Sequence, residues 1–384
     1  MSAVIAPNEV RAPAIPRPRL GAWDWPLVLL TAVLVVFGLF MILSASSSHA
    51  DAVYGDSLTF FNRQVAGVLL GVGVSIGVTV VPWRWLRAVG YPAAGLSFLG
   101  LMLVFTPLAY TANGATRWIH VGVNIQPSEF AKVGLILMLA TFLQRNEGRM
   151  RDWTILVTAG VLSLGLIGPV FIEPDFGTTV VMSGLVGVML FVAGLRWRWV
   201  MGLGGLGVLA LFGLAILEPY RIVRLTSFTD PLADGSGSGY QVVQGWIALA
   251  SGGTFGNGLA TGLAQRGFLP EAHTDFILAV VGEELGGVGL FVFLMIYLAM
   301  LWRGVTIASR AVDLYGRLLG AALTAMLAAQ AIINLGVVVG WVPAKGLVFP
   351  FLSYGASAVV VHLFSVGLLL RVSMETRAHD AQEG

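Results

Sequence analysis

Cysteine is absent from this sequence of 384 residues, and its absence excludes both disulfide bonds and thiolate chemistry. A zinc site built on clustered cysteines and histidines is excluded for the same reason. Charge is scarce, because only 11% of the residues are Asp, Glu, Lys or Arg, whereas 57% are hydrophobic. So little charge excludes an ordinary soluble protein, and the net charge of only +2 gives no reason to expect a nucleic-acid partner.

Long apolar runs are abundant instead. Several approach 20 residues, the length that a helix needs to cross ~30 Å of hydrocarbon. Backbone groups in lipid must pair internally, so each run predicts a helix. We therefore predict an all-α, polytopic membrane protein with about ten transmembrane helices in a single domain, residues 25–372. The expected spans are residues 25–45, 64–82, 89–110, 128–143, 155–172, 177–194, 199–217, 275–301, 319–340 and 350–370.

Arginines orient these spans. With the amino terminus inside, ten basic residues fall in inner loops and five in the two tails, which makes fifteen of the 22. Positive residues favour the cytoplasmic side, so we expect both termini to be cytoplasmic. Residues 1–24 are polar and rich in proline, which predicts a disordered tail. Residues 373–384 are expected to form the second cytoplasmic tail.

One long outer loop, residues 218–274, is expected between helices seven and eight. Its middle section, YQVVQGWIALASGG, is amphipathic and predicts a helix along the membrane surface. Seven basic residues resist the inward bias, and either they snorkel to the interface or they serve an anionic partner at the outer leaflet. They are Arg63, Arg117, Lys132, Arg221, Arg224, Arg266 and Lys345.

The stretch LPEAHTDFILAVVGEELG, residues 269–286, places acidic residues at the entrance and along the wall of the eighth span. Asp275 lies at the outer mouth of this span. Either Thr274 or Asp275 caps the helix, or Asp275 is a general base that faces a water-filled cavity. For Glu283 and Glu284, which approach mid-membrane, we favour a structural hydrogen-bond network over catalysis.

Three further motifs carry polar residues. In NGATRWIHVGVNIQPSEFAK (113–132), Glu129 and Lys132 are three residues apart and are expected to pair on one helix face. The pair either serves the site or only holds the fourth span in place. Arg117 and Trp118 are either an interface anchor or a phosphate clamp with an apolar platform. EPDFGTT (173–179) predicts a tight turn and a helix cap at Asp175.

The last motif, VPAKGLVFPFLSYGAS (342–357), contains three helix breakers, Pro343, Gly346 and Pro350. They predict irregular backbone near membrane depth, which is tolerated where it is buried in protein or lines a cavity. Lys345 offers a positive charge there, and Ser353 offers a hydroxyl group.

The sequence resembles the SEDS family (shape, elongation, division and sporulation) over nearly its whole length. The matching motifs are NGATRWI, QPSEFAK, EPDFGT, SGYQVVQ, LPEAHTDFILAVVGEELG and PAKGLVFPFLSYGAS. The resemblance implies a peptidoglycan glycosyltransferase that polymerises lipid II at the outer face of the bacterial cytoplasmic (inner) membrane. It also implies a class B penicillin-binding protein as transpeptidase partner, together with other divisome membrane proteins.

The same resemblance implies that Asp275 is the catalytic residue, the base that accepts the proton of the acceptor hydroxyl. Magnesium or another divalent cation between carboxylate and pyrophosphate is compatible with this chemistry, but the sequence does not demand one. The residues expected to bind substrate are Arg117, Trp118, Glu129, Lys132, Glu271, His273, Lys345 and Ser353.

GEELG and the lysine of PAKGL are more like the FtsW division branch of the family than the RodA elongation branch. Three residues depart from the division pattern or the family pattern: Gly262, Gln265 and Ala356. The alternatives to a division glycosyltransferase are a RodA-like elongation paralogue, a lipid II flippase or other transporter, and a non-catalytic scaffold. Bond formation from lipid II supplied in detergent separates the enzymes from the flippase and the scaffold.

Overall fold

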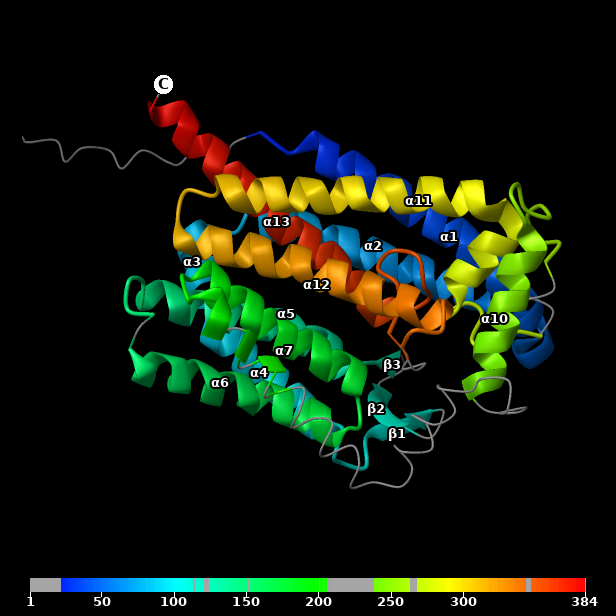
Figure 1. The fold of residues 1–384 in the computed structure, drawn as a ribbon, viewed down its shortest axis with the longest axis horizontal. Coiled ribbons are helices and arrows are strands. Elements are labelled where there is room, and N and C mark those ends of the chain that lie inside the picture. The colour runs from blue at the N-terminus through cyan, green and yellow to red at the C-terminus, as the bar shows by residue number, and fades with distance from the viewer. Residues whose placement is uncertain are drawn as a thin grey trace, which may run out of the picture.

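The structure is a computed structural model that describes residues 22–112, 115–120, 124–150, 152–199, 201–202, 204–205, 207, 238–262, 268–342 and 347–383. Most of these residues lie in helices that run side by side as a bundle (Figure 1). In this part of the chain, six helices are long and apolar enough to cross a membrane, and two shorter helices are apolar as well. The chain is therefore a multi-pass membrane protein.

Each predicted span that the structure describes contains one helix. Residues 199–217 lie mostly outside the described residues, so the total of ten helices stays a prediction. The helices are α1 Trp25–Tyr54, α2 Thr59–Thr79, α3 Trp83–Ala88, α4 Gly90–Leu103, α5 Pro127–Arg145, α6 Trp153–Ile172, α7 Phe176–Val192, α10 Ser238–Gly252, α11 Ile277–Arg310, α12 Leu314–Val338 and α13 Ala356–Glu383.

Aspartates begin four of these helices. Asp24, Asp152, Asp175 and Asp313 each accept a hydrogen bond from a backbone N–H in the first turn of α1, α6, α7 and α12, respectively. A carboxylate at this position pairs a donor that the helix itself leaves open, and it faces the positive end of the helix dipole. The sequence therefore sets these starting points locally.

Burial divides the helices into an inner and an outer group. Helices α5, α12 and α13 bury most of their side chains inside the bundle. Helices α1, α2, α6 and α11 instead expose large apolar side chains, among them Phe40, Leu69, Leu164 and Phe291. Water would penalise each of these by roughly 25 cal/mol per Å² of apolar surface, whereas lipid does not. The outer helices therefore face the hydrocarbon.

The all-α expectation is wrong between α4 and α5. Three short strands, β1 Ala109–Ala112, β2 Ala115–His120 and β3 Asn124–Ile125, form an antiparallel sheet in the order β1-β2-β3. Tyr110 pairs with Trp118 across the first two strands. β-Branched and aromatic residues fit such a pleated surface, and the sequence Asn113-Gly114 between β1 and β2 is a strong hairpin signal. Helix α4 accordingly ends before the predicted span does.

Helix α11 is broken at Gly286, which has φ 70° and ψ −176°. A residue with a side chain rarely adopts this conformation. Four backbone hydrogen bonds of 2.9 to 3.1 Å join residues 253–258 to residues 283–288 around the break. The first part of α11 thereby packs against α10, the helix predicted in the middle of the long outer loop (Figure 1). Residues 208–237 and 263–267 of this region lie outside the described residues.

The two glutamates before this break belong to a hydrogen-bond network, as predicted. Ser44 of α1 donates to Glu284 Oε1 at 2.6 Å, and Ser251 of α10 donates to Glu283 Oε1 at 3.4 Å. Both glutamates are buried. The network holds α1, α10 and the first part of α11 together.

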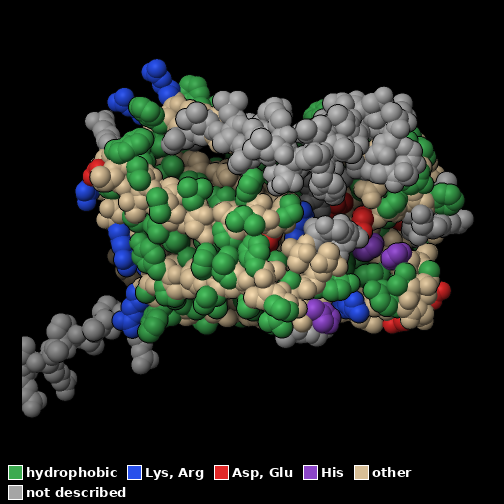
Figure 2. All heavy atoms as spheres, turned by 90° about the horizontal axis from the view of Figure 1, so that it is seen from below, with side chains coloured by type: hydrophobic (Ala, Val, Ile, Leu, Met, Phe, Trp, Pro, Cys, Tyr) green, Lys and Arg blue, Asp and Glu red, His purple; other side chains and the backbone are tan. Residues whose placement is uncertain are grey.

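Basic side chains crowd one end of the bundle, which we call the basic end, whereas histidines lie nearer the opposite end (Figure 2). At the basic end Asp24 is fully buried and accepts hydrogen bonds from Arg303 at 2.6 and 2.9 Å and from Arg377 at 2.9 Å. These contacts join α1, α11 and α13. The positive-inside rule predicts that the basic end faces the cytoplasm.

The two ends of the chain differ in how far the structure describes them. Residues 1–21 of the predicted amino-terminal tail lie outside the described residues, whereas Asp24 already belongs to the bundle. Helix α13 continues through the predicted carboxy-terminal tail to Glu383. It begins at Ala356, later than predicted, because Pro350 and the positive φ of 67° at Phe351 keep residues 349–355 out of the helix.

Gly38 supports residues 349–355, because a Cβ atom there would overlap the carbonyl group of Phe351. We expect Gly38→Ala to destabilise the protein by about 1–3 kcal/mol, as overpacking in a well-packed core does. The measurement is the melting temperature of the purified protein in detergent. Gly77→Ala on α2 is the matched control, because a Cβ there meets no atom within 4 Å. Equal melting temperatures for the two variants would contradict this packing.

Candidate active site

Three successive carbonyl groups fix the loop that carries Asp275. The carbonyls of residues 273–275 accept hydrogen bonds from Tyr354 N at 2.9 Å, Ser353 Oγ at 2.7 Å and Asn334 Nδ2 at 3.0 Å, respectively. The donors come from α12 and from the irregular segment 349–355. The backbone of the loop is therefore held in place from two sides, directly before α11 begins.

Asp275 itself is half-buried at this position. The N-cap residue of α11 is Phe276, so the interpretation of Thr274 or Asp275 as the helix cap is wrong. The Thr274 hydroxyl instead donates to Glu271 Oε2 at 2.7 Å. The Thr274 hydroxyl thus holds the side chain of Glu271 within the loop that carries Asp275.

Asn334 links this loop to a second polar cluster. Its Nδ2 atom also donates to the carbonyl of Leu347 at 2.8 Å. The side chain of Leu347 packs against Gly177 near the start of α7, where a Cβ atom would overlap it. One amide group on α12 therefore connects the Asp275 loop, residue 347 and the start of α7.

The second cluster surrounds Asp175, a buried carboxylate. It accepts hydrogen bonds from Thr178 N at 3.2 Å, Ser128 Oγ at 3.4 Å and Gln126 Nε2 at 3.4 Å, and Arg117 Nη1 lies 3.9 Å away. The predicted cap is confirmed, and the same carboxylate also joins α5 and the sheet. A buried charge with so many partners holds three elements in register.

Arg117 fastens the small sheet to the turn between α6 and α7. Its Nη2 atom donates to the Pro174 carbonyl at 2.6 Å. Trp118 follows it on β2 and is half-buried. Burial raises the pKa of the adjacent Glu173 to about 8, with Asp175 adding to this rise and Arg117 opposing it. Glu173 is therefore largely protonated at neutral pH, a feature that the sequence analysis missed.

The predicted pair of Glu129 and Lys132 is confirmed on α5. Lys132 Nζ lies 2.7 Å from Glu129 Oε1, and the two side chains are 0% and 3% exposed. Removing one partner of such a pair leaves a buried charge and typically costs 3–5 kcal/mol. The pair therefore stabilises α5 whatever else it does.

A line of buried polar side chains runs from Asn334 to this pair. Gln330 lies one helical turn from Asn334 on α12, and its Oε1 atom is 3.0 Å from His362 Nε2 of α13. Lys132 lies within electrostatic reach of His362. We call Asn334, Gln330, His362, Lys132 and Glu129 the polar column. Hydrogen bonds join Asn334 to the Asp275 loop, Gln330 to His362 and Lys132 to Glu129.

Sequence reasoning missed Asn334, Gln330 and His362. All three are buried within spans that read as apolar. A signal was present, because polar groups inside a membrane span are costly and usually have a partner. The spacing of four residues between Gln330 and Asn334 also places both on one face of α12.

Other predicted site residues have different surroundings. Lys345 lies outside the described residues. The Ser353 hydroxyl makes two hydrogen bonds, since it also accepts one from Phe349 N at 2.8 Å.

The His273 ring lies 4.7 Å from that of Phe60 and 5.7 Å from those of His49 and Tyr354, measured between ring centroids. Burial lowers the pKa of His273 to about 4, against the opposing charge of Glu271. His273 is therefore neutral at neutral pH.

The described residues contain no group of three His, Asp or Glu side chains that could hold a metal ion. A magnesium ion at Asp275 would thus depend on substrate oxygens for most of its ligands, which is a common arrangement.

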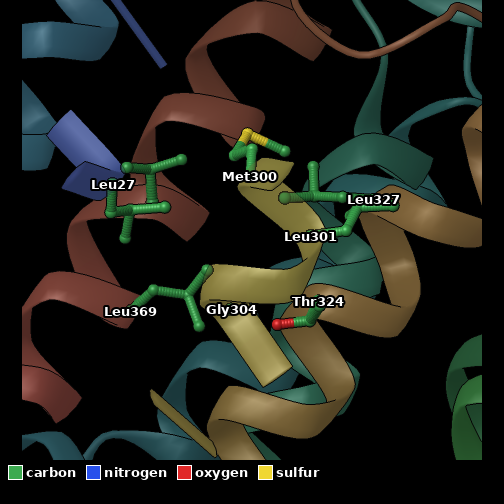
Figure 3. Close-up of a pocket in the computed structure, with 8 residues that line it drawn as sticks. Leu27, Met300, Leu301, Gly304, Thr324, Leu327 and Leu369 are labelled. Carbon is green, nitrogen blue, oxygen red and sulfur yellow. The ribbon is translucent and has the colours of Figure 1, made fainter. Parts of the chain in front are cut away.

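Figure 3 shows an apolar pocket between α1, α11, α12 and α13. It has no room for a water molecule, and Leu27, Met300 and Leu327 are among its lining residues. This pocket therefore holds no substrate.

Ser353→Ala removes two buried hydrogen bonds that connect segment 349–355 to the Asp275 loop. We expect the free energy of unfolding to fall by about 1–3 kcal/mol, because a backbone N–H and a carbonyl lose their partner. Thermal unfolding in detergent measures this. Ser163→Ala is the control, since that buried hydroxyl only contacts the Ala159 carbonyl of its own helix. Equal losses of unfolding free energy in both variants would argue against a stabilising connection between segment 349–355 and the Asp275 loop.

His273 predicts a loss of stability in mild acid. Its pKa of about 4 lies below the ordinary value of 6.5, so between these pH values the unfolded chain binds a proton that the folded protein does not. Stability should therefore fall as the pH falls through this window. We expect a smaller fall for His273→Gln than for the wild type or for the exposed control His379→Gln, measured as melting temperature against pH. An unchanged fall in His273→Gln would refute the assignment.

The chain resembles known proteins along nearly its whole length. A family model for cell cycle proteins, named after FtsW, RodA and SpoVE, matches residues 25–378. A protein of Geobacter sp. (strain M18), named probable peptidoglycan glycosyltransferase FtsW, is 37% identical over 363 residues, which cover 94% of this chain and 99% of the relative. Stage V sporulation protein E of Bacillus subtilis (strain 168) is 40% identical over 361 residues, with 92% and 98% covered.

A solved structure agrees with these relatives. It is the structure of a peptidoglycan synthase complex that coordinates polymerization and crosslinking. Its matching chain has a TM-score of 0.78 and 34% identity, over 92% of this chain and 98% of that chain. The resemblance predicted from the motifs is confirmed, and this chain belongs to the FtsW, RodA and SpoVE family of cell cycle proteins.

Proposed function

We propose that this chain is a peptidoglycan glycosyltransferase that polymerises lipid II into β-1,4 glycan strands at the outer face of the bacterial cytoplasmic membrane. The observation that carries the proposal is the half-buried carboxylate of Asp275 on a backbone fixed at three successive carbonyls. Relatives named FtsW and the division-like motifs support a role in septal wall synthesis. In this orientation the basic end faces the cytoplasm and Asp275 lies near the outer leaflet.

The reaction needs one displacement. The donor sugar is α-linked to a pyrophosphate on a polyprenyl chain, and the product bond is β-1,4, so the anomeric centre inverts. Asp275 accepts the proton of the acceptor 4-hydroxyl while the oxygen of that hydroxyl bonds to the anomeric carbon. At the same time the bond from that carbon to pyrophosphate breaks. The fixed loop holds the backbone that carries the carboxylate in one position, which favours proton transfer at hydrogen-bond distance.

The leaving pyrophosphate gains negative charge as its bond to the anomeric carbon breaks, and nearby positive charge stabilises it. Arg117, Lys132 and Lys345 are the proposed sources. Arg117 is partly exposed at the sheet, whereas Lys132 is fully buried and paired with Glu129. Trp118, Glu129, Glu271, His273 and Ser353 complete the proposed substrate-binding residues. Neutral His273 would offer an aromatic face and a hydrogen bond rather than a charge. A divalent cation, when bound, would add charge neutralisation between Asp275 and the pyrophosphate.

We also propose a class B penicillin-binding protein as the transpeptidase partner, with other divisome membrane proteins around it. The similarity to a chain of a peptidoglycan synthase complex supports this partner. Elongation in place of division, and lipid II flipping in place of polymerisation, are the competing proposals. The polar column favours the transport proposal, because buried polar groups between helices are what a transport path through the membrane would need. However, its residues are at most 3% exposed, so it offers no open path in this conformation.

Asp275→Asn tests the catalytic proposal. Loss of a general base typically slows a reaction by about 100- to 10,000-fold, so we expect almost no glycan strands from the purified variant with lipid II. Strand formation is measured on a gel, with and without the cognate transpeptidase and with a chelator arm. Asp51→Asn, at an exposed acid near the end of α1, is the control and should polymerise normally. Strands at the wild-type rate from a folded Asp275→Asn protein would exclude the assignment.

A further inference from the structure

A second polar site lies at the basic end, far from the Asp275 loop along the bundle. A cavity of about 70 Å³ opens there between the ends of α11 and α13. Arg303, Arg310 and Arg377 line it together with Asp24 and Asp380, so three positive charges face two negative ones. A water molecule needs roughly 10–15 Å³ by this kind of measure, so the cavity has room for a group of several heavy atoms.

Asp24 preorganises two of these arginines. Arg303 donates to its carboxylate through Nε and Nη2, and Arg377 donates through Nη2. Asp24 also accepts from Ser373 Oγ at 3.3 Å and from Leu27 N at 3.2 Å, so its own hydrogen-bonding capacity is used inside the protein. Each guanidinium has five N–H donors in a rigid plane, and the two donors that Arg303 spends on Asp24 leave three for a ligand.

The surroundings place this cavity at headgroup depth. Trp302 directly precedes Arg303 and is 76% exposed, and Trp25 directly follows Asp24 and is 60% exposed. Exposed tryptophans mark the membrane–water interface. Helices α1 and α11 pack together and expose apolar side chains beyond this end of the bundle, among them Leu29 and Leu298.

We propose that this cavity binds the phosphate group of an anionic phospholipid, with the acyl chains along α1 and α11. Arginine matches phosphate geometry with paired donors, and basic pockets between membrane helices on the cytoplasmic side suit anionic headgroups. The net excess of one positive charge fits a headgroup of one negative charge. Arg310 is the arginine to test, because it is exposed and forms no ion pair among the described residues, so its loss leaves the Asp24 contacts intact.

Titration of the purified protein with short-chain phosphatidylglycerol, followed by native mass spectrometry and thermal shift, tests the site. We expect saturable binding that weakens about tenfold in Arg310→Gln, as loss of one charge-assisted contact predicts. Arg317→Gln is the matched control, an exposed arginine at the same end whose nearest acid is Glu147, 3.9 Å away and outside the cavity. Its affinity should equal that of the wild type.

Two further arms identify the ligand. Short-chain phosphatidylcholine should bind at least tenfold more weakly, because its headgroup carries no net charge. Inorganic phosphate at matched concentration should give no thermal shift, because it lacks the acyl chains. Equal weakening in Arg310→Gln and Arg317→Gln would show unspecific attraction and overturn the proposal. Equal binding of both lipids, or an equal shift with inorganic phosphate, would overturn it as well.

Discussion

The structure depends on the fixation of one short stretch of backbone. The carbonyls of residues 273–275 are each held by a donor from another part of the chain, and the donors are Tyr354, Ser353 and Asn334. Gly38 in turn allows α1 to approach the segment that supplies two of these donors. Three other regions of the chain thereby determine where the backbone that carries the Asp275 carboxylate lies. A base that must accept a proton at hydrogen-bond distance gains from such fixation, because the entropy of positioning is lost on folding rather than during the reaction.

Polar groups inside the bundle are the second constraint. The polar column and the Asp175 cluster place carboxylate, ammonium, imidazole and amide groups among helices that otherwise pack apolar side chains. Each such group is costly in a medium of low polarity unless it has a partner, so these networks specify one arrangement of the helices. They also bring α5, α7, α12 and α13 together around the end of the bundle that carries Asp275. At the other end Asp24 does the same for α1, α11 and α13.

Length and hydropathy were sufficient to predict the helices of the apolar runs that the structure describes, because a membrane span leaves the backbone no alternative. The same rule favoured a helix where the sheet begins, because residues 109–125 directly follow an apolar run. The sequence Asn113-Gly114 is the only hairpin signal there. In the site, Glu129 and Lys132 were predictable as a local pair three residues apart. Ser353 was identified without its structural role, and Asn334, Gln330 and His362 were missed. Ser353 donates to the Thr274 carbonyl 79 residues away, and the partners of Asn334, Gln330 and His362 are 13 to 59 residues away. No local spacing encodes such contacts.

We expect Asn334 to serve the reaction by positioning the backbone of Asp275. A double-mutant cycle on the rate of glycan bond formation tests it most directly, with Asn334→Ala, Asp275→Glu and the double variant, all checked for folding. Residues that act as a unit give losses that do not add. If Asn334 positions Asp275, Asn334→Ala slows the wild type strongly but adds little to the loss already caused by Asp275→Glu. Losses that multiply independently in the double variant would contradict it.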